Sequence, residues 1–234
     1  MPRVGKAIGR VIASSGAFSR RASQRLVEAG RVSLNGEVCR RPAARVVDGD
    51  AVEVDGQQVE TALAPPRLWR YCKPAGLLTT HSDSHGRPTV FDSLRSSAPW
   101  LPRVVSAGRL DRATEGLLLL TTSGPLARAL ELPSSGLERV YRVLLSVGAR
   151  DVTPRMLDEL GRGLTLRDGT RFRPIVATAD EAWAEGGAEG GAEGGWRWLT
   201  MRLTEGKNRE VRLRRGCAVL SRHTPAPFCC GAHP

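Results

Sequence analysis

One acidic residue, Asp111, stands between Arg109 and Arg112 and shortly before an uninterrupted apolar run at residues 117–120. Such a run predicts a strand or helix buried on both faces, so the polar residues before it should form a loop fixed to the core. The two arginines favour the carboxylate form of Asp111, because nearby positive charge stabilises it. Asp111 is therefore a candidate nucleophile or base. A surface turn held by ion pairs is the alternative interpretation.

The string at residues 108–121, GRLDRATEGLLLLT, resembles the signature loop of the RNA pseudouridine synthases, G-R-L-D-x-x-T-x-G-L-L-L-L-T. In that family the Asp of this loop is the catalytic residue, which implies this role for Asp111. Glu115 departs from the small residue that is usual at its position. Because the target uridine must leave its stack to reach the loop, we expect Arg109 to fill the vacated space.

Two further motifs resemble the same family. Residues 73–76, Lys-Pro-Ala-Gly, match the K-P-x-G motif at the start of the catalytic fold, although in isolation they indicate only a turn. Residues 138–143, ERVYRV, match a motif whose tyrosine lies beside the catalytic Asp and packs on the uracil ring. The resemblance implies that role for Tyr141. Without the resemblance, a half-buried strand aromatic is the favoured explanation of Tyr141.

Residues 205–212, EGKNREVR, match another motif of the family. The match implies that Arg212 forms an ion pair with Asp111 and that Lys207 and Arg209 bind RNA. As a bare charge run, the same residues would indicate a solvated helix start. Residues 87–92, RPTVFD, resemble a motif of the synthases that modify ribosomal RNA, and they favour large-subunit (23S) RNA as the substrate.

The first 45 residues carry ten Lys or Arg and two acidic residues, a net charge of +8 out of +11 for the whole chain. Apolar spacing predicts two helices in this region. Ser19 can cap the second helix, whose apolar side should be formed by Ala22, Leu26 and Ala29. Asn35-Gly36 then predicts a hairpin between short strands.

Two helices and a small sheet with the pattern S-R-R-x8-G-R-V-x-x-N-G resemble the S4 RNA-binding domain, a helix pair that docks on folded ribosomal RNA. Arg21 and Arg25 lie four residues apart on an exposed helix face and, with Arg20 of the motif, can bind successive phosphates. The alternative is a solvated basic face without a partner.

These patterns predict an α+β chain. We expect a small S4-like α/β RNA-binding domain at residues 1–60, a Pro-containing linker at 61–67 and a pseudouridine synthase domain with a mixed, mainly antiparallel sheet at 68–212. Residues 213–234 depart from the family, since they have no helical apolar stripe and resemble frame-shifted or disordered sequence. This tail puts folding and activity of the second domain in question.

The whole chain of 234 residues has a pI near 10.6, which predicts a polyanionic partner. Because no amphipathic membrane anchor is evident, nucleic acid is the preferred partner. No apolar stretch is long enough to cross a bilayer and no signal peptide is evident, so we expect a cytoplasmic monomer with no membrane partner. Five cysteines without regular spacing favour reduced thiols over disulfides.

His81 and His85 lie four residues apart, but no Cys or carboxylate stands at metal-ligand spacing from them. The histidines and adjacent cysteines near residue 230 also fit no usual tetrahedral pattern. We therefore expect no metal site, and we expect His81 and His85 to face solvent or RNA.

The resemblance implies isomerisation of a specific uridine in ribosomal RNA to pseudouridine without a cofactor, on structured RNA or on a ribosome assembly intermediate. Two other functions remain open. A glycosidase-like hydrolase would use Asp111 and Glu115 as a carboxylate pair and release the base. A non-catalytic ribosomal RNA-binding or ribosome assembly factor would keep the first domain active while the tail inactivates the second.

Overall fold

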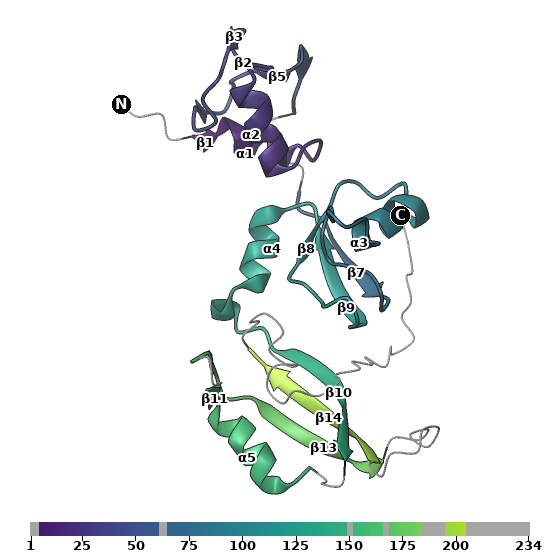
Figure 1. The fold of residues 1–234 in the computed structure, drawn as a ribbon. Helices are drawn as coiled ribbons and strands as arrows, with labels where there is room; N and C mark the ends of the chain where they lie inside the picture. Colours follow the sequence, from purple (N-terminus) through teal and green to yellow (C-terminus); the bar gives the residue numbers. More distant parts are fainter. Residues whose placement is uncertain (1–4, 61–64, 149–151, 166–168, 184–194, 205–234) are drawn as a thin grey trace. The chain divides into compact units, whose positions relative to one another are not determined.

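The computed structural model describes residues 5–60, 65–148, 152–165, 169–183 and 195–204 (Figure 1). The chain divides into two compact units. The first contains residues 1–69 with 98–105 and 120–126, and the second contains residues 70–97, 106–119 and 127–234. None of the helices in the described ranges is long and apolar enough to span a membrane.

The N-terminal part of the first unit has two helices, α1 (Ile8–Ser14) and α2 (Arg20–Glu28). A four-stranded antiparallel sheet follows in the order β3-β2-β5-β6, and β1 pairs antiparallel with β4. The bounds of these strands are β1 Lys6–Ala7, β2 Val32–Leu34, β3 Glu37–Val38, β4 Arg45–Val46, β5 Val52–Val54 and β6 Gln57–Gln58. The hairpin predicted at Asn35-Gly36 is confirmed, since both residues have positive φ, 53° and 84°.

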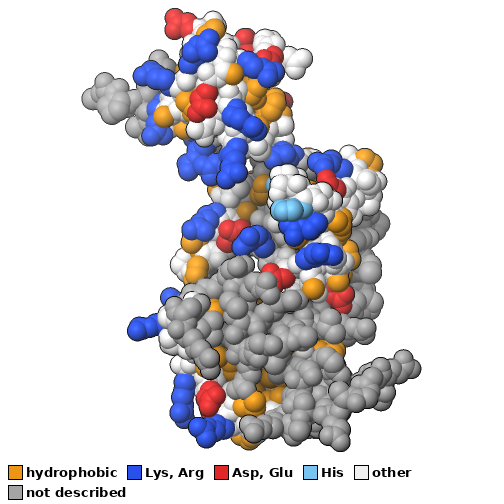
Figure 2. Space-filling view, viewed as in Figure 1, with side chains coloured by type: hydrophobic (Ala, Val, Ile, Leu, Met, Phe, Trp, Pro, Cys, Tyr) orange, Lys and Arg blue, Asp and Glu red, His pale blue; other side chains and the backbone are white. Residues whose placement is uncertain are grey.

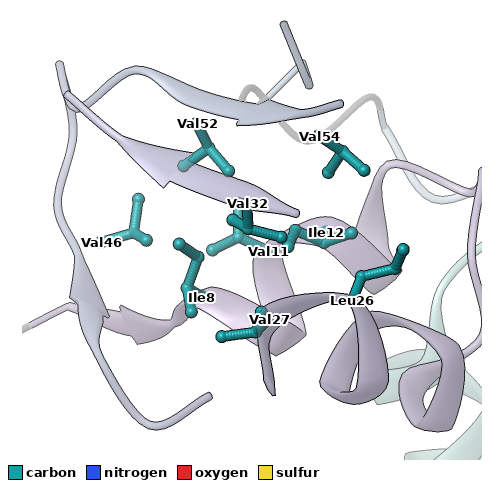
Figure 3. Packing of buried hydrophobic residues seen from close by; sticks show 9 residues of the cluster. All are labelled: Ile8, Val11, Ile12, Leu26, Val27, Val32, Val46, Val52 and Val54. Carbon is teal, nitrogen blue, oxygen red and sulfur yellow. The ribbon is translucent and has the colours of Figure 1, made fainter. Parts of the chain in front are cut away.

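One apolar cluster holds these helices and strands together (Figure 3). Its buried members come from both helices and from β2, β4 and β5, and they are Ile8, Val11, Ile12, Leu26, Val27, Val32, Val46, Val52 and Val54. Because the helices bury one stripe each and leave the other faces in water, their charged residues stay exposed. The result is the small α/β domain that was predicted.

A three-stranded sheet in the order β7-β9-β8 follows, with β7 at Leu68–Lys73, β8 at Val105–Ala107 and β9 at Gly116–Thr121. Helices α3 (Val90–Ser97) and α4 (Gly124–Glu131) and the 3-10 helix η1 (Pro133–Ser135) accompany it. Leu118 and Leu120 of β9 are buried, whereas Leu117 is 52% exposed. The prediction of burial on both faces is therefore wrong at Leu117, because side chains of a strand alternate and only one face is covered there.

The second unit also contains an antiparallel sheet in the order β10-β14-β13. Its strands are β10 Arg139–Gly148, β13 Val176–Trp183 and β14 Gly195–Leu203. Helix α5 (Pro154–Arg162) lies along β13, and β11 (Leu164–Thr165) pairs with β12 (Arg171–Phe172) (Figure 1). The buried cluster of this region is Val143, Leu160, Ile175, Leu199, Met201 and Leu203. The α+β class with mainly antiparallel pairing is confirmed.

Candidate active site

Asp111 lies in the loop that joins β8 to β9, here called the Asp111 loop and defined as residues 108–115. Gly108 opens the loop with a φ of 86°, a conformation that favours glycine. The N–H of Thr114 donates to the carbonyl of Asp111 at 3.0 Å, which closes a tight turn at the acid. The Asp111 side chain is half-buried, while Arg109 and Arg112 are exposed.

The ammonium group of Lys73 fixes this loop to the end of β7. Lys73 has no exposed surface, and its Nζ donates to the carbonyl oxygens of Thr114 at 2.8 Å, Pro74 at 3.0 Å, Asp111 at 3.2 Å and Arg112 at 3.4 Å. An ammonium has three N–H groups, so one of them is shared between two carbonyls. The backbone of the loop therefore wraps around a single buried cation.

Two carboxylates of the loop oppose the cost of burying that cation. Burial lowers the pKa of Lys73 below its usual 10.5, whereas the negative charges of Asp111 and Glu115 raise it. The candidate catalytic acid and Glu115 thus offset part of the cost of burying Lys73, while burial has the larger effect on its pKa. Glu115, the residue that departs from the family pattern, contributes to the electrostatics of the loop.

The segment after Lys73 adds more bonds to the same loop. The N–H of Gly76 donates to the carbonyl of Arg112 at 2.7 Å. The hydroxyl of Thr79 donates to the carbonyl of Leu110 at 2.8 Å and accepts from the Leu110 N–H at 3.3 Å. Residues 73–79 therefore form the support of the Asp111 loop, a role that the sequence pattern of a simple turn did not indicate.

The beginning of the loop is held from α4. The carboxylate of Glu131, the last residue of α4, accepts from the Gly108 N–H at 2.8 Å. Arg139 of β10 donates to the carbonyls of Leu130 and Glu131 at 3.2 and 3.1 Å, which satisfies the end of that helix. Glu131 and Arg139 were not predicted as site residues, because their partners are backbone groups that no local motif reveals.

Tyr141 lies in β10 opposite Met201 of β14. It is half-buried and packs against the apolar cluster of that sheet. Arg142, the next residue, points to the other face, where its guanidinium lies 4.9 Å from the ring centre of Trp198. This placement agrees with the interpretation of Tyr141 as a half-buried strand aromatic, and its contact with uracil stays a prediction.

The N-terminal cations lie where phosphates could reach them. Ser19 caps α2 as predicted, since its hydroxyl accepts from the Ala22 N–H at 3.1 Å. Arg20, Arg21 and Arg25 are exposed on this helix. On the face shown in Figure 2, Lys and Arg side chains are spread over the N-terminal domain.

The buried face of α2 differs from the prediction. It is formed by Ser23, Leu26 and Val27, whereas Ala29 is exposed. Ala29 keeps a helical backbone conformation and its N–H donates to the Arg25 carbonyl at 2.9 Å, but the helical repeat places it to the side of the stripe formed by Ser23, Leu26 and Val27.

His81 does not simply face solvent. It is half-buried, and its ring stacks on Phe91 of α3 with ring centres 3.7 Å apart, whereas His85 is exposed as predicted. Among the described residues, no group of three or more His, Cys, Asp or Glu side chains could hold a metal ion. Lys207, Arg209, Arg212 and the tail at 213–234 lie outside the described residues.

The described residues thus form a small basic α/β domain and an α+β domain in which the Asp111 loop, with two arginines and two carboxylates, surrounds a buried lysine. Comparison with family models shows which class of enzyme this is. The S4 domain model matches residues 10–52, and the RNA pseudouridylate synthase model matches residues 67–215. The chain belongs to the RNA pseudouridylate synthase family, whose members are isomerases.

Individual proteins agree with this assignment. An uncharacterised RNA pseudouridine synthase of Rickettsia conorii is 39% identical over 88% of this chain and 80% of its own length. The ribosomal large subunit pseudouridine synthase B of Xylella fastidiosa is 38% identical over 93% of this chain and 44% of its own length. A crystal structure of a pseudouridylate synthase shares the fold, with a TM-score of 0.54 and 20% identity over 92% of this chain and 86% of that one.

Proposed function

We propose that this protein isomerises a specific uridine of large-subunit ribosomal RNA to pseudouridine without a cofactor, with Asp111 as the catalytic carboxylate. The observation that carries the proposal is the Asp111 loop, whose signature sequence is held around the buried ammonium of Lys73. The ribosomal substrate is supported by the likeness to large-subunit synthases of Xylella and Xanthomonas, of which the chain covers 44% and 38%.

The reaction breaks the bond between C1′ and N1, turns the base while it is held, and joins C5 to C1′. The proton on C5 leaves and N1 gains one, so the mass of the nucleotide does not change. A carboxylate can assist by attacking the sugar, by adding to C6 or by removing the 2′ proton, and the proposal includes all three. A half-buried Asp111 on a loop with many hydrogen bonds suits each of them, because positioning lowers the barrier.

The other site residues have roles in holding the substrate. Arg109, which is exposed and lies two residues before Asp111 in the sequence, fills the space left by the extruded uridine. Tyr141 retains the freed ring between the two steps, and Arg212 pairs with Asp111.

Cations in two parts of the sequence bind the phosphates of the RNA. These residues are Arg20, Arg21, Arg25, Lys207 and Arg209. The three arginines of α2 support this role by their exposure on one capped helix.

Carbodiimide mapping of pseudouridine in ribosomal RNA, from cells with and without this protein, tests the proposal. We expect one large-subunit site to lose its modification, and a copy carrying Asp111→Asn should not restore it. Release of free base from the RNA would instead indicate the hydrolase. An unchanged pseudouridine map, together with tight RNA binding, would indicate the non-catalytic assembly factor.

A further inference from the structure

Two side chains outside the family motifs hold backbone groups just before Asp111. Glu131 accepts from the N–H of Gly108, three residues before the acid, and Thr79 binds both backbone groups of Leu110, the residue next to it. All of these residues belong to the same compact unit. The path of the chain into Asp111 is therefore fixed from two directions.

Glu131 occupies a position that helix electrostatics disfavours. It is the last residue of α4, where the helix dipole is negative and an acidic side chain is repelled. Its Oε1 nevertheless points to Gly108, whose φ of 86° sets the direction of the loop. The two bonds from Arg139 to the carbonyls of Leu130 and Glu131 offset the unfavourable dipole. The hydrogen bond from the Gly108 N–H therefore gives the Glu131 carboxylate a structural role, which is to hold the first residue of the Asp111 loop.

The hydroxyl of Thr79 makes two hydrogen bonds to the backbone of Leu110. It donates to the Leu110 carbonyl at 2.8 Å and accepts from the Leu110 N–H at 3.3 Å, so a single side chain binds both backbone polar groups of Leu110, which belong to the two peptide units on either side of its Cα. Rotation of the backbone at Leu110 would break both bonds. Because Asp111 follows directly, its carboxylate would move with that rotation.

We propose that Thr79 and Glu131 are positioning residues of this enzyme, which set the orientation of Asp111 without touching the RNA. The inference rests on the proposed function of Asp111. Loss of either hydrogen bond should slow the chemical step while RNA affinity is kept, because the side chains support the loop and not the substrate.

Matched pairs of variants test this inference in the full-length protein. Thr79→Val removes the hydroxyl at nearly constant volume and Thr79→Ser keeps it, while Glu131→Ala removes the acceptor and Glu131→Gln keeps a carbonyl oxygen. The readouts are the single-turnover rate of pseudouridine formation with saturating enzyme and the Kd for the same RNA. We expect a rate roughly 10-fold lower for Thr79→Val and Glu131→Ala, since small displacements of reacting groups have such effects. Thr79→Ser and Glu131→Gln should stay within about twofold of wild type, and Kd should not change.

Arg128→Ala is the control for Glu131. Arg128 is exposed on α4 with its guanidinium 4.0 Å from the Glu131 carboxylate, so its removal changes the charge near Glu131 but not the bond to Gly108. Its rate should equal that of wild type. The inference would be overturned if Thr79→Val were as fast as Thr79→Ser and Glu131→Ala as fast as Glu131→Gln. A reduced rate of Arg128→Ala would overturn it as well.

Asp111→Asn, measured in the same series, separates the two proposals. If Asp111→Asn is inactive while Thr79→Val and Glu131→Ala are fully active, only the positioning inference fails. If Asp111→Asn is fully active, the proposed function fails. If the circular dichroism of Thr79→Val or Glu131→Ala shows that this variant does not fold, the matched pair at the other position still tests the positioning inference.

Discussion

Lys73 shows how one residue can organise the Asp111 loop without belonging to it. Its ammonium exchanges water for the carbonyls of Asp111, Arg112 and Thr114. Burial lowers the pKa of Lys73, and the negative charges of Asp111 and Glu115 oppose that shift. A buried cation is costly unless it is hydrogen-bonded, and the loop supplies carbonyl acceptors together with the negative charges of Asp111 and Glu115. The fold of the loop and the charge of Lys73 therefore depend on each other.

Replacing Lys73 with Met should remove the charge that holds the Asp111 loop. The methionine fills a similar volume, but three loop carbonyls lose their donor, and each unsatisfied polar group costs about 1–3 kcal/mol, partly offset because the charge no longer has to be buried. We expect the free energy of unfolding in urea to fall by about 1–3 kcal/mol and pseudouridine formation to be lost. Lys6→Met, at an exposed position of β1, should change neither. Wild-type activity of Lys73→Met would contradict the supporting role.

The turn at residues 80–87 is built around another charged residue, Asp83. Its carboxylate accepts from the backbone N–H groups of His85 and Arg87, both at 3.0 Å, and from the Arg87 guanidinium at 2.7 and 3.1 Å. The side-chain bonds from Arg87 hold the pKa of Asp83 well below its usual 3.8. Because the folded pKa is lowered, the stabilisation is fully present above pH 3.8 and is lost as the pH falls toward the lowered value.

A carboxyl NMR titration checks this explanation. In wild type, Asp83 should remain ionised well below pH 3.8, and in Arg87→Ala its pKa should rise toward 3.8. Arg95→Ala is the matched control, because Arg95 pairs with Asp92 and not with Asp83. An unchanged Asp83 titration in Arg87→Ala would show that Arg87 does not cause the shift.

At the scale of helices and strands, the sequence predicted those features whose causes are local. The Ser19 cap and the Asn35-Gly36 hairpin depend on neighbouring residues, and both are present. Lys73 was not predicted, because its partners lie about 40 residues away and its motif indicates only a turn. Leu117 was assigned to a buried face, because an unbroken apolar run conceals the alternation of a strand.

Across the whole molecule, charge is the property most directly tied to RNA. Most of the net charge of +11 lies in the first 45 residues, and Lys and Arg side chains are spread over that domain (Figure 2). Binding through phosphates releases counterions, so the logarithm of the RNA association constant should fall linearly with the logarithm of salt concentration.

Arg21→Ala should weaken RNA binding and reduce the magnitude of that salt slope by about 0.7–1, the value of one phosphate contact. Filter binding at several salt concentrations measures both quantities. Arg155→Ala changes the total charge equally, but Arg155 lies on α5 with its side chain 90% exposed and has no predicted contact with RNA. If the two variants lose the same affinity and slope, net charge and not the α2 surface determines binding.

The central claim is that the carboxylate of Asp111 performs the isomerisation. The most direct test compares wild type with Asp111→Asn in single-turnover conversion of the target uridine, with RNA affinity measured in parallel. The amide keeps the size of the side chain but removes its charge. We expect Asp111→Asn to bind the RNA as tightly as wild type and to form no pseudouridine. Product formation at the wild-type rate would contradict the claim.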